Sequence, residues 1–534
     1  MALGQFPPHD DDEISVSVGA AVITAVGDIL RRVVKTDGTV TAVDFPMIWK
    51  PKTNPTLEPS TTHEIAFDMI NGFDDEFVYL SGMNVNSIAR VSKVDPTRQQ
   101  IFVFPVKDGL TADPHTLIFS NVKSEENVGM LWVGLENQGR IVKLNMMKIM
   151  ENRRMDAREG EADHIHLKDE DFSAIYDVRI SGNGMPKPIN TRPHGFCFDK
   201  DHKYIWFTGK LTNTVGRVSI HNNDLQHFEL PTLGAVPIYI ALGPDNNIWG
   251  TCLGNNIIYR VTTGEHPVVH EMPISLLGAK HRPIAIKPDP RGFNDDRYKF
   301  MWFSNEATHS ICRIDINAFE KYYVNENKGC ELDPISNSKM CVCSSACQFQ
   351  FRKKNEESLE MFHADIIAEI PIPKVNRKMK LGALALDKDG AIWTQSYVDL
   401  TITSAEDNVE ALSDYIIKLG GFNLDESNTA QQHDKAQRKA VSLNGVQIDF
   451  YEVPTKNTQL HRICIDQHQH VWFTELGSDR VGAIFRNDNA ETVCGNMRKR
   501  LGTSNVEQNI TSKKREKREG ENNDMEISER DSDR

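Results

Sequence analysis

The sequence predicts an all-β fold, a seven-bladed β-propeller with long inter-strand insertions and a disordered charged C-terminal tail. Three observations predict this fold. A motif with a central aromatic residue recurs seven times, and a short strand with an internal basic residue lies roughly ten residues after nearly every copy. The shortest spacing between copies, Trp206 to Trp249, falls within the ~40–45 residues expected of a propeller blade. A β-sandwich with accidental tryptophan spacing is the alternative.

The aromatic copies share an apolar residue, an aromatic residue and a further strand residue. They are Val78-Tyr79-Leu80, Leu131-Trp132-Val133, Ile205-Trp206-Phe207, Ile248-Trp249-Gly250, Met301-Trp302-Phe303, Ile392-Trp393-Thr394 and Val471-Trp472-Phe473. The strands that follow them lie at 88–91, 142–144, 215–218, 258–261, 311–314, 417–419 and 481–484, and only the last lacks a basic residue. Such short apolar runs, separated by Gly, Asn, Asp and Pro, are typical of strands and turns.

The ring is expected to close through the N-terminal part of the chain. The last repeat supplies three strands through Ile484, and the stretch Val40–Pro46 reads as the missing outer strand. Pairing the two would remove two open sheet edges. Leu30–Val33 also resembles a third strand and competes with 481–484, so the register of closure stays open at this stage.

The chain divides into three predicted parts: an N-terminal segment at 1–38 that is partly strand, the propeller at 39–486, and a disordered tail at 487–534. Two insertions interrupt the blades, one near 145–190, which reads as charged and loop-like, and one near 316–362. The tail carries many charges and almost no aromatic residues, so it cannot bury enough area to order itself. Its run Lys513–Arg518 is either a nuclear-import signal or part of a solvated tail.

Composition excludes several partners. Seventy-five acidic residues against sixty-one basic ones give a net charge of −14, which argues against general affinity for nucleic acid or an anionic membrane. No apolar run approaches the ~20 residues of a membrane span. The segment MALGQFPPHDDDE places acids where a secretory signal needs basic and then apolar residues. We therefore expect an intracellular, cytoplasmic protein, with the nucleus as a second location through 513–518, and a monomer because a closed ring completes its own sheets.

The nine cysteines, an odd number, favour mostly reduced thiols. Four of them lie in the second insertion, at Cys330, Cys341, Cys343 and Cys347. Only Cys343 and Cys347 have a spacing that suits paired zinc ligands. A structural zinc, disulfides and unpaired thiols remain open for this cluster, and the spacing favours unpaired thiols.

Histidines mark the start of four predicted inner strands. They are His63, His115, His194 and His461, whereas the other three blades carry Ile238, Ile284 and Gly382 there. With 18 histidines in 534 residues, chance predicts about a quarter of one histidine over seven positions. The four belong to consecutive blades of a closed ring, so we expect them together at the mouth of the channel. Clustered imidazoles suit general acid–base work or borderline metals, and capping of strand ends is the structural alternative.

The blade pattern resembles the virginiamycin B lyases, also called streptogramin lyases. The resemblance rests on P-H-G-F-C-F-D at 193–199, I-W-F-T at 205–208 and N-T-V-G-R-V at 213–218, and recurs at 461–484. It implies a seven-bladed propeller in which Mg²⁺ and a histidine general base open a cyclic depsipeptide by elimination, breaking an ester C–O bond without water. The family site combines a histidine on one blade, an acid-Pro-His on the next, and a second acid shortly after the tryptophan of that blade.

One set of residues matches this site. By resemblance, His115 of Asp113-Pro114-His115 would be the catalytic base, Asp113 and Glu136 would hold Mg²⁺, and His63 would contact substrate, with His194 and His461 as further substrate-binding residues. Two carboxylates suit Mg²⁺, a hard ion that prefers oxygen ligands.

Other blades depart from the family pattern. Arg192-Pro193-His194 has a base in place of the acid, Lys210 stands where the second acid belongs, and Glu306 has the acid spacing on a blade without histidine. The matching pair also lies on the first two blades, whereas the family uses the last two.

Two functions follow as hypotheses. The first is a magnesium-assisted carbon–oxygen lyase or hydrolase acting on a cyclic ester or depsipeptide-type substrate, with a small-molecule or peptide ligand at the channel mouth. The second is a non-catalytic propeller scaffold for protein–protein interaction through its insertions, since propellers host many unrelated functions.

Overall fold

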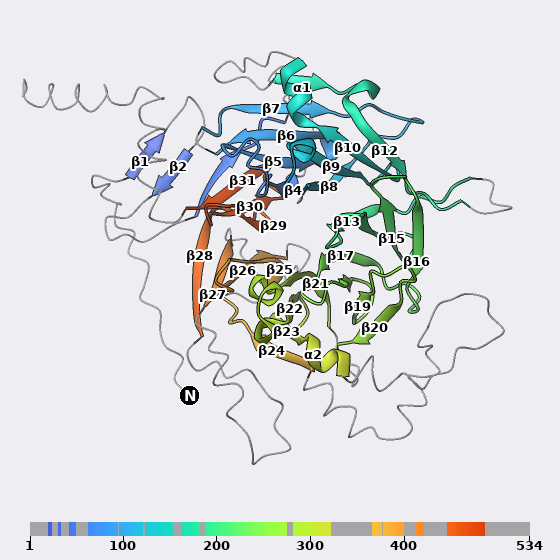
Figure 1. The fold of residues 1–534 in the computed structure, drawn as a ribbon. Coiled ribbons are helices and arrows are strands. Elements are labelled where there is room, and N and C mark those ends of the chain that lie inside the picture. Colours follow the sequence, from blue (N-terminus) through green and yellow to red (C-terminus); the bar gives the residue numbers. More distant parts are fainter. Residues whose placement is uncertain are drawn as a thin grey trace, which may run out of the picture. The chain divides into compact units, whose positions relative to one another are not determined.

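Seven sheets, antiparallel except for one added strand in the first, surround a common axis (Figure 1). The computed structural model describes residues 20–23, 30–33, 42–49, 62–93, 95–120, 123–152, 163–181, 187–274, 281–321, 366–375, 378–399, 412–420 and 446–485. Residues 41–484, together with 22–32, form one compact unit that contains the whole ring. The predicted seven-bladed propeller is therefore confirmed.

The blades are numbered in chain order, and each begins with its inner strand. Blade 1 holds β4 (Thr62–Ala66), β5 (Phe77–Gly82), β6 (Ser87–Ser92), β7 (Gln99–Val103) and β11 (Asp163–His166), and blade 2 holds β8 (Pro114–Phe119), β9 (Met130–Leu135), β10 (Arg140–Asn145) and β12 (Phe172–Asp177). Blade 3 holds β13 (Pro193–Phe198), β14 (Tyr204–Gly209), β15 (Thr214–Ser219) and β16 (Leu225–Glu229), and blade 4 holds β17 (Pro237–Leu242), β18 (Ile248–Cys252), β19 (Ile257–Val261) and β20 (Val269–Pro273).

The remaining blades follow the same order. Blade 5 holds β21 (Pro283–Pro288), β22 (Phe300–Asn305), β23 (Ser310–Asp315) and β24 (Ile367–Pro371), blade 6 holds β25 (Met379–Leu386), β26 (Ile392–Val398), β27 (Ser413–Gly420) and β28 (Gln447–Lys456), and blade 7 holds β29 (Leu460–Ile465), β30 (Val471–Glu475), β31 (Arg480–Ile484) and β3 (Val43–Pro46). The described helices are α1 (Met146–Asn152), α2 (Ile316–Phe319) and the short 3₁₀ turns Met83–Val85, Glu125–Asn127, Asp169–Asp171, Pro290–Phe293 and Asp296–Tyr298. Outside the blades, β1 (Ala20–Ile23) pairs with β2 (Leu30–Val33).

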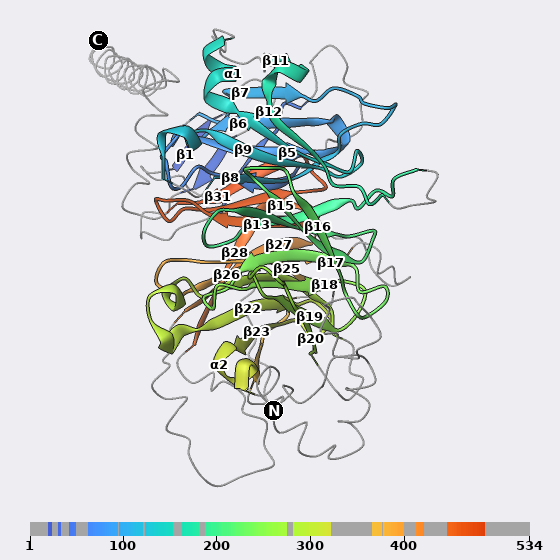
Figure 2. The same cartoon turned by 45° about the vertical axis from the view of Figure 1, so that its right-hand side comes forward.

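The ring closes by the N-terminal strand that the sequence indicates. Strand β3 pairs antiparallel with β31, placing Val43 opposite Ala483 and Phe45 opposite Val481. Strand β31 also pairs with β30, so 481–484 is the third strand of blade 7 and Leu30–Val33 is not. The C-terminal strands drawn in red and orange lie beside the blue strands of blade 1 in both views (Figures 1 and 2). Closure therefore joins the two ends of the propeller.

The loop-like interpretation of 145–190 is wrong for part of that segment. Helix α1 follows β10 directly, β11 extends blade 1 by pairing parallel to β7, and β12 is the outer strand of blade 2. In β12 the side chain of Tyr176 is buried and stacks on Trp132 with ring centroids 5.4 Å apart, while its neighbours Ile175 and Asp177 are exposed. This alternation of burial stabilises an edge strand although the surrounding sequence is charged.

Several predictions lie outside the described residues. They concern the cysteine cluster at Cys330, Cys341, Cys343 and Cys347, most of the second insertion, the tail from 486 and its basic run at 513–518. Among the described residues, no helix is long and apolar enough to cross a membrane. The boundaries of the three predicted parts stay predictions.

The register explains why basic residues recur in the third strands. Each aromatic residue of a second strand pairs across the sheet with the basic residue of the third, as in Trp206 opposite Arg217 and Trp249 opposite Arg260. The guanidinium carbon of Arg217 lies 5.3 Å from the Trp206 ring centroid. Such cation–π contacts contribute about 0.5–2 kcal/mol each. Blade 7 has Ala483 at this place, as its sequence requires.

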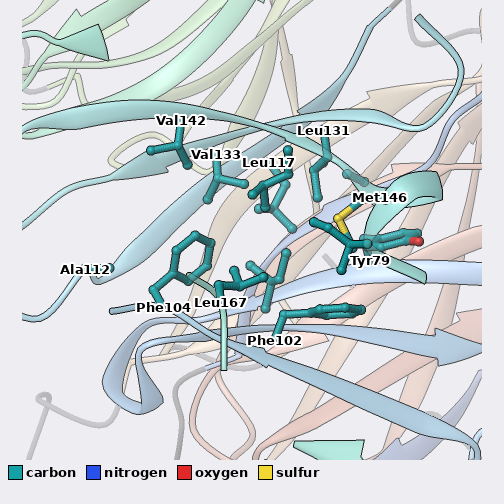
Figure 3. Packing of buried hydrophobic residues seen from close by; sticks show 14 of the residues in the cluster. Tyr79, Phe102, Phe104, Ala112, Leu117, Leu131, Val133, Val142, Met146 and Leu167 are labelled. Atoms are coloured by element: carbon teal, nitrogen blue, oxygen red, sulfur yellow. The ribbon is translucent and has the colours of Figure 1, made fainter. Parts of the chain in front are cut away.

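Apolar side chains fill the spaces between neighbouring sheets. Figure 3 shows one such core between blades 1 and 2, where Phe102 and Tyr79 approach Leu131 and Leu117 from the facing sheet. Burying each large side chain contributes about 1.5–3 kcal/mol. These cores hold the inner strands at fixed positions around the axis.

Candidate functional site

Every inner strand starts with the same irregularity. In six blades one regular pair joins the last residue of the second strand, as in Pro114 opposite Leu135, and the register then shifts before pairing resumes at Leu117 opposite Val133. In blade 6 three regular pairs precede the shift. The first residue within the shift, which directly follows the last regular pair before it, has no regular cross-strand partner. We call these the ring-centre positions: His63, His115, His194, Ile238, Ile284, Gly382 and His461.

Hydroxyl side chains link these positions from blade to blade. In blade 1 the Ser81 hydroxyl accepts a hydrogen bond from the Glu64 amide at 2.9 Å and donates to the His115 carbonyl of blade 2 at 2.9 Å. The equivalent donors to His194, Ile238, Ile284, Gly382 and His63 carbonyls are Thr116, Thr208, Thr251, Ser304 and Thr474. Most of these hydroxyls come two residues after the blade's aromatic residue, which gives a physical reason for the recurring Ser or Thr there.

The four predicted histidines meet at the ring centre. The ring centroids of His63 and His115 are 3.8 Å apart, those of His115 and His194 are 3.9 Å apart, and those of His63 and His461 are 4.0 Å apart. We refer to His63, His115, His194 and His461 as the histidine cluster. The first three blades and the last one thus contribute one continuous group of imidazoles.

The cluster is more buried than a channel mouth requires. The exposed fractions of His63, His115 and His194 are 4%, 2% and 8%, and His461 is half-buried. The first three side chains are thus buried where they meet, and their expected place at the mouth of the channel stays a prediction. Their rings contact each other closely, and the sequence pattern does not indicate this packing.

Hydrogen-bond partners define which ring nitrogens carry protons. The Thr116 hydroxyl donates to the His194 carbonyl, so its oxygen accepts from Nδ1 of His115 at 3.2 Å. Nδ1 of His194 donates to the Ile238 carbonyl at 2.9 Å. In the neutral form of both imidazoles, Nε2 is then the unprotonated nitrogen.

The remaining pair follows the same reasoning. Arg462 Nη1 lies 2.9 Å from His461 Nε2, and a guanidinium only donates, so this nitrogen is an acceptor. Nε2 of His63 lies 2.6 Å from the same nitrogen and therefore carries its proton. Nδ1 of His63 is left unprotonated, buried and without a hydrogen-bond partner within the described part of the chain.

Burial and neighbouring positive charge keep the cluster neutral. Burial is the main cause that lowers the pKa of all four histidines well below 6.5, and Arg462 lowers it further in each. Neighbouring imidazoles add to this lowering for His63, His115 and His461. Lys210 also lowers the pKa of His115, His194 and His461. The ring centre thus combines neutral bases with two fixed cations.

Arg462 is held in place by two further residues. Its Nε donates to Glu64 at 3.1 Å, and its Nη1 donates to the Tyr239 hydroxyl. Arg462 and Glu64 were not singled out from the sequence, although each directly follows a cluster histidine, in Q-L-H-R-I and T-T-H-E-I. Their adjacency to the register shift is the signal that would have found them, because the shift brings two successive residues near the axis.

The predicted metal ligands Asp113 and Glu136 lie next to each other, but their carboxylates have different partners. The Glu136 amide donates to the Asp113 carbonyl at 3.1 Å, so both residues stand at one end of blade 2. The buried Glu136 carboxylate, however, faces Lys210, with Nζ 3.4 Å from Oε1, and Asp113 accepts from the Thr111 hydroxyl at 2.9 Å. A fixed ammonium group beside Glu136 competes with a cation for the same carboxylate. As arranged, these residues do not fit Mg²⁺, and a magnesium ion at Asp113 and Glu136 stays a prediction.

The third acid with the family spacing is also engaged. Glu306 accepts from Arg282 Nη1 at 2.6 Å and from the Tyr397 hydroxyl. Within the described residues, no group of three or more His, Cys, Asp or Glu side chains is arranged to hold a metal ion. The acidic residues near the ring centre are thus each paired with a positive or hydroxyl-bearing partner.

Comparison with known proteins identifies relatives of the fold. The profile of the Virginiamycin B lyase family matches residues 124–399, just over half of the chain. Among solved structures, a streptogramin B lyase is 18% identical with a TM-score of 0.48, covering 83% of this chain and 96% of its own. A virginiamycin B lyase from Staphylococcus aureus is 16% identical with a TM-score of 0.48, covering 84% of this chain and 99% of its own. No curated protein sequence matches the chain.

Proposed function

Because the chain belongs to the virginiamycin B lyase family, we propose that its ring centre is an acid–base site that opens a cyclic ester or depsipeptide-type substrate by cleaving a carbon–oxygen bond. His115 is the catalytic base, and His63, His194 and His461 contact the substrate. The observation that carries this proposal is the group of four touching imidazoles, in which the Thr116 hydroxyl lies 3.2 Å from Nδ1 of His115 and so favours the tautomer with an unprotonated Nε2.

Neutrality suits a base but limits its strength. A general base must be unprotonated at the working pH, and the lowered pKa of His115 ensures this at neutral pH. The same shift reduces the affinity of the imidazole for a proton, so the transition state needs further stabilisation. Arg462 and Lys210 supply positive charge for the negative charge that develops on the substrate.

The proposed reaction is an elimination. Nε2 of His115 removes the proton from the carbon next to a substrate carbonyl. The electron pair left behind forms a carbon–carbon double bond, the ester C–O bond breaks, and the ester oxygen leaves as part of a carboxylate. Arg462 and Lys210 are the cationic groups of the ring centre that would stabilise first the enolate-like charge and then the carboxylate.

Magnesium would add Lewis-acid stabilisation of the carbonyl oxygen if it bound at Asp113 and Glu136. Since Lys210 already faces Glu136, none of the steps above depends on the ion. Arg462 and Lys210 provide the positive charge that the metal would otherwise supply. The proposal therefore predicts turnover without added metal.

The test compares His115→Asn with His194→Asn on a panel of cyclic depsipeptides and lactones. Asparagine is used because alanine would leave a larger cavity at these buried positions. Loss of the general base should reduce kcat by 10²–10⁴-fold in His115→Asn, while His194→Asn should affect KM more than kcat. Mass spectrometry separates the two reactions, because elimination leaves the mass of the substrate unchanged and hydrolysis adds one water.

Two results would contradict the proposal. Equal kinetic losses in both variants would remove His115 from its role as base even if turnover is found. A wild-type protein that turns over none of the esters, although circular dichroism shows it folded, would contradict catalysis on this substrate class and return attention to the scaffold hypothesis.

A further inference from the structure

Blade 6 departs from the other blades at the ring centre. Its ring-centre residue is Gly382, which has no side chain, and the residue two after its tryptophan is Gln395 in place of Ser or Thr. The Gly382 carbonyl still accepts from the Ser304 hydroxyl of blade 5 at 2.5 Å. The backbone of Gly382 therefore occupies the same place as that of His63 or His115, and only the side chains differ.

Gln395 fills the space that a ring-centre side chain would take. It lies opposite the register shift between Leu381 and Leu384, within the strand that pairs with β25. A Cβ atom added to Gly382 would lie 2.8 Å from Nε2 of Gln395 and 3.3 Å from its Cγ. The amide of Gln395 thus stands where blade 6 would otherwise present a residue like His461 of the next blade.

The side-chain amide of Gln395 is buried and has no hydrogen-bond partner among the described residues. Its side chain has an exposed fraction of 0%, and neither Nε2 nor Oε1 has a hydrogen-bond partner within the described part of the chain. Buried polar groups in native proteins are nearly always paired, and an exception calls for an explanation. Gln99 shows the usual state, since its buried amide donates to the Pro46 and Pro96 carbonyls and accepts from the Ile48 amide.

We infer that Gln395 is a specificity-determining residue whose amide binds a peptide group of the ligand at the ring centre. A primary amide offers one acceptor and two donors side by side, which matches the N–H and C=O of one residue in an extended peptide. A simple lactone has no N–H to pair with Oε1. The ligand is then a peptide or depsipeptide, and this substrate class rests on the proposed function of the same site.

The first arm of the test measures the stability of the free protein. Gln395→Met keeps the length of the side chain and removes the unpaired polar atoms, so the melting temperature should rise by about 1–3 °C. Gln99→Met, the matched control, removes a fully hydrogen-bonded amide and should lower it. A second variant, Gln395→Thr, introduces the Ser or Thr type that five of the other six blades carry at this position, blade 2 having Gly134. A fall in melting temperature for both Gln395 variants, as for Gln99→Met, would overturn the inference.

The second arm measures binding independently of turnover. The probes are a cyclic hexadepsipeptide and its derivatives in which a single amide N–H is replaced by an ester oxygen, studied by calorimetry with the full chain. The wild type should bind the parent at least tenfold more tightly than one of the derivatives, because an unpaired Oε1 is left behind. Gln395→Met should lose this preference, and Gln99→Met should keep it.

The outcomes separate this inference from the proposed function. A wild type without any amide preference, or a preference that survives in Gln395→Met, overturns the role of Gln395. Turnover that depends on His115 would stand in either case. Conversely, an amide preference that depends on Gln395 supports the inference even if His115→Asn proves fully active.

Discussion

Acid should destabilise this protein through the histidine cluster. The pKa of each of the four imidazoles is lowered well below 6.5 in the folded state, while the unfolded chain titrates near 6.5. As the pH falls below 6.5, the unfolded state therefore binds protons that the folded state does not. The stability that neutral burial permits is present above pH 6.5 and is lost as the pH falls toward the lowered pKa values.

The magnitude follows from proton linkage. Each histidine that is neutral when folded and protonated when unfolded contributes about 1.4 kcal/mol per pH unit to the slope of the unfolding free energy. Four such groups give a slope of about 5–6 kcal/mol per pH unit below pH 6.5. Glu475 opposes them by about one proton, because burial raises its pKa to about 8 and the folded state then holds a proton that the unfolded state releases.

The assay is urea unfolding followed by tryptophan fluorescence at half-unit intervals from pH 7 to pH 5. His115→Asn should flatten the slope by about 1.4 kcal/mol per pH unit relative to the wild type. His221 lies exposed on the turn after β15, so His221→Asn serves as the control and should leave the slope unchanged. An unchanged slope in His115→Asn would refute the reasoning, since it would mean that His115 takes up its proton equally well in both states.

Three further outcomes are expected. Lys210→Met removes the ammonium group beside Glu136, so added Mg²⁺ should raise the melting temperature of this variant and leave that of the wild type unchanged; calorimetry measures the binding directly. Thr474→Val removes the hydrogen bond to the His63 carbonyl and should cost about 1–3 kcal/mol in urea unfolding. Glu475→Gln removes a group whose pKa is raised to about 8, so the loss of stability that this group causes in the wild type as the pH rises toward 8, and that ends above 8, should be absent, with thermal unfolding at pH 6 to 9 as the measurement.

Much of the fold was predictable because it depends on repeated local patterns. Trp206 and Arg217 recur at fixed offsets because they face each other across two paired strands, so sequence spacing reports sheet register directly. The closing strand near Val43 was predictable for a similar reason, since one blade lacked an outer strand and one strand lacked a blade. The strand at 172–177 was missed because only one of its side chains, Tyr176, is fully buried, and a charged context hides so weak an alternation.

The candidate site was predictable only in part. The positions of the four histidines follow from the repeat, so their meeting at the axis could be expected before any coordinates. Their burial could not, because it depends on how the rings pack against each other across four blades. The ion pair between Lys210 and Glu136 joins blades 2 and 3, and no spacing within one blade encodes it.

The hydroxyl bridges connect the chemistry of the site to closure of the ring. His63 belongs to the first blade and His461 to the last, and their Nε2 atoms lie 2.6 Å apart across the junction of the two blades. Thr474 reinforces the same junction by donating to the His63 carbonyl. Since the contact with His461 also determines which nitrogen of His63 carries the proton, the protonation pattern of the cluster depends on the junction of blades 7 and 1. The histidine cluster therefore depends on the junction between the first and the last blade, because its four members come from blades 7, 1, 2 and 3.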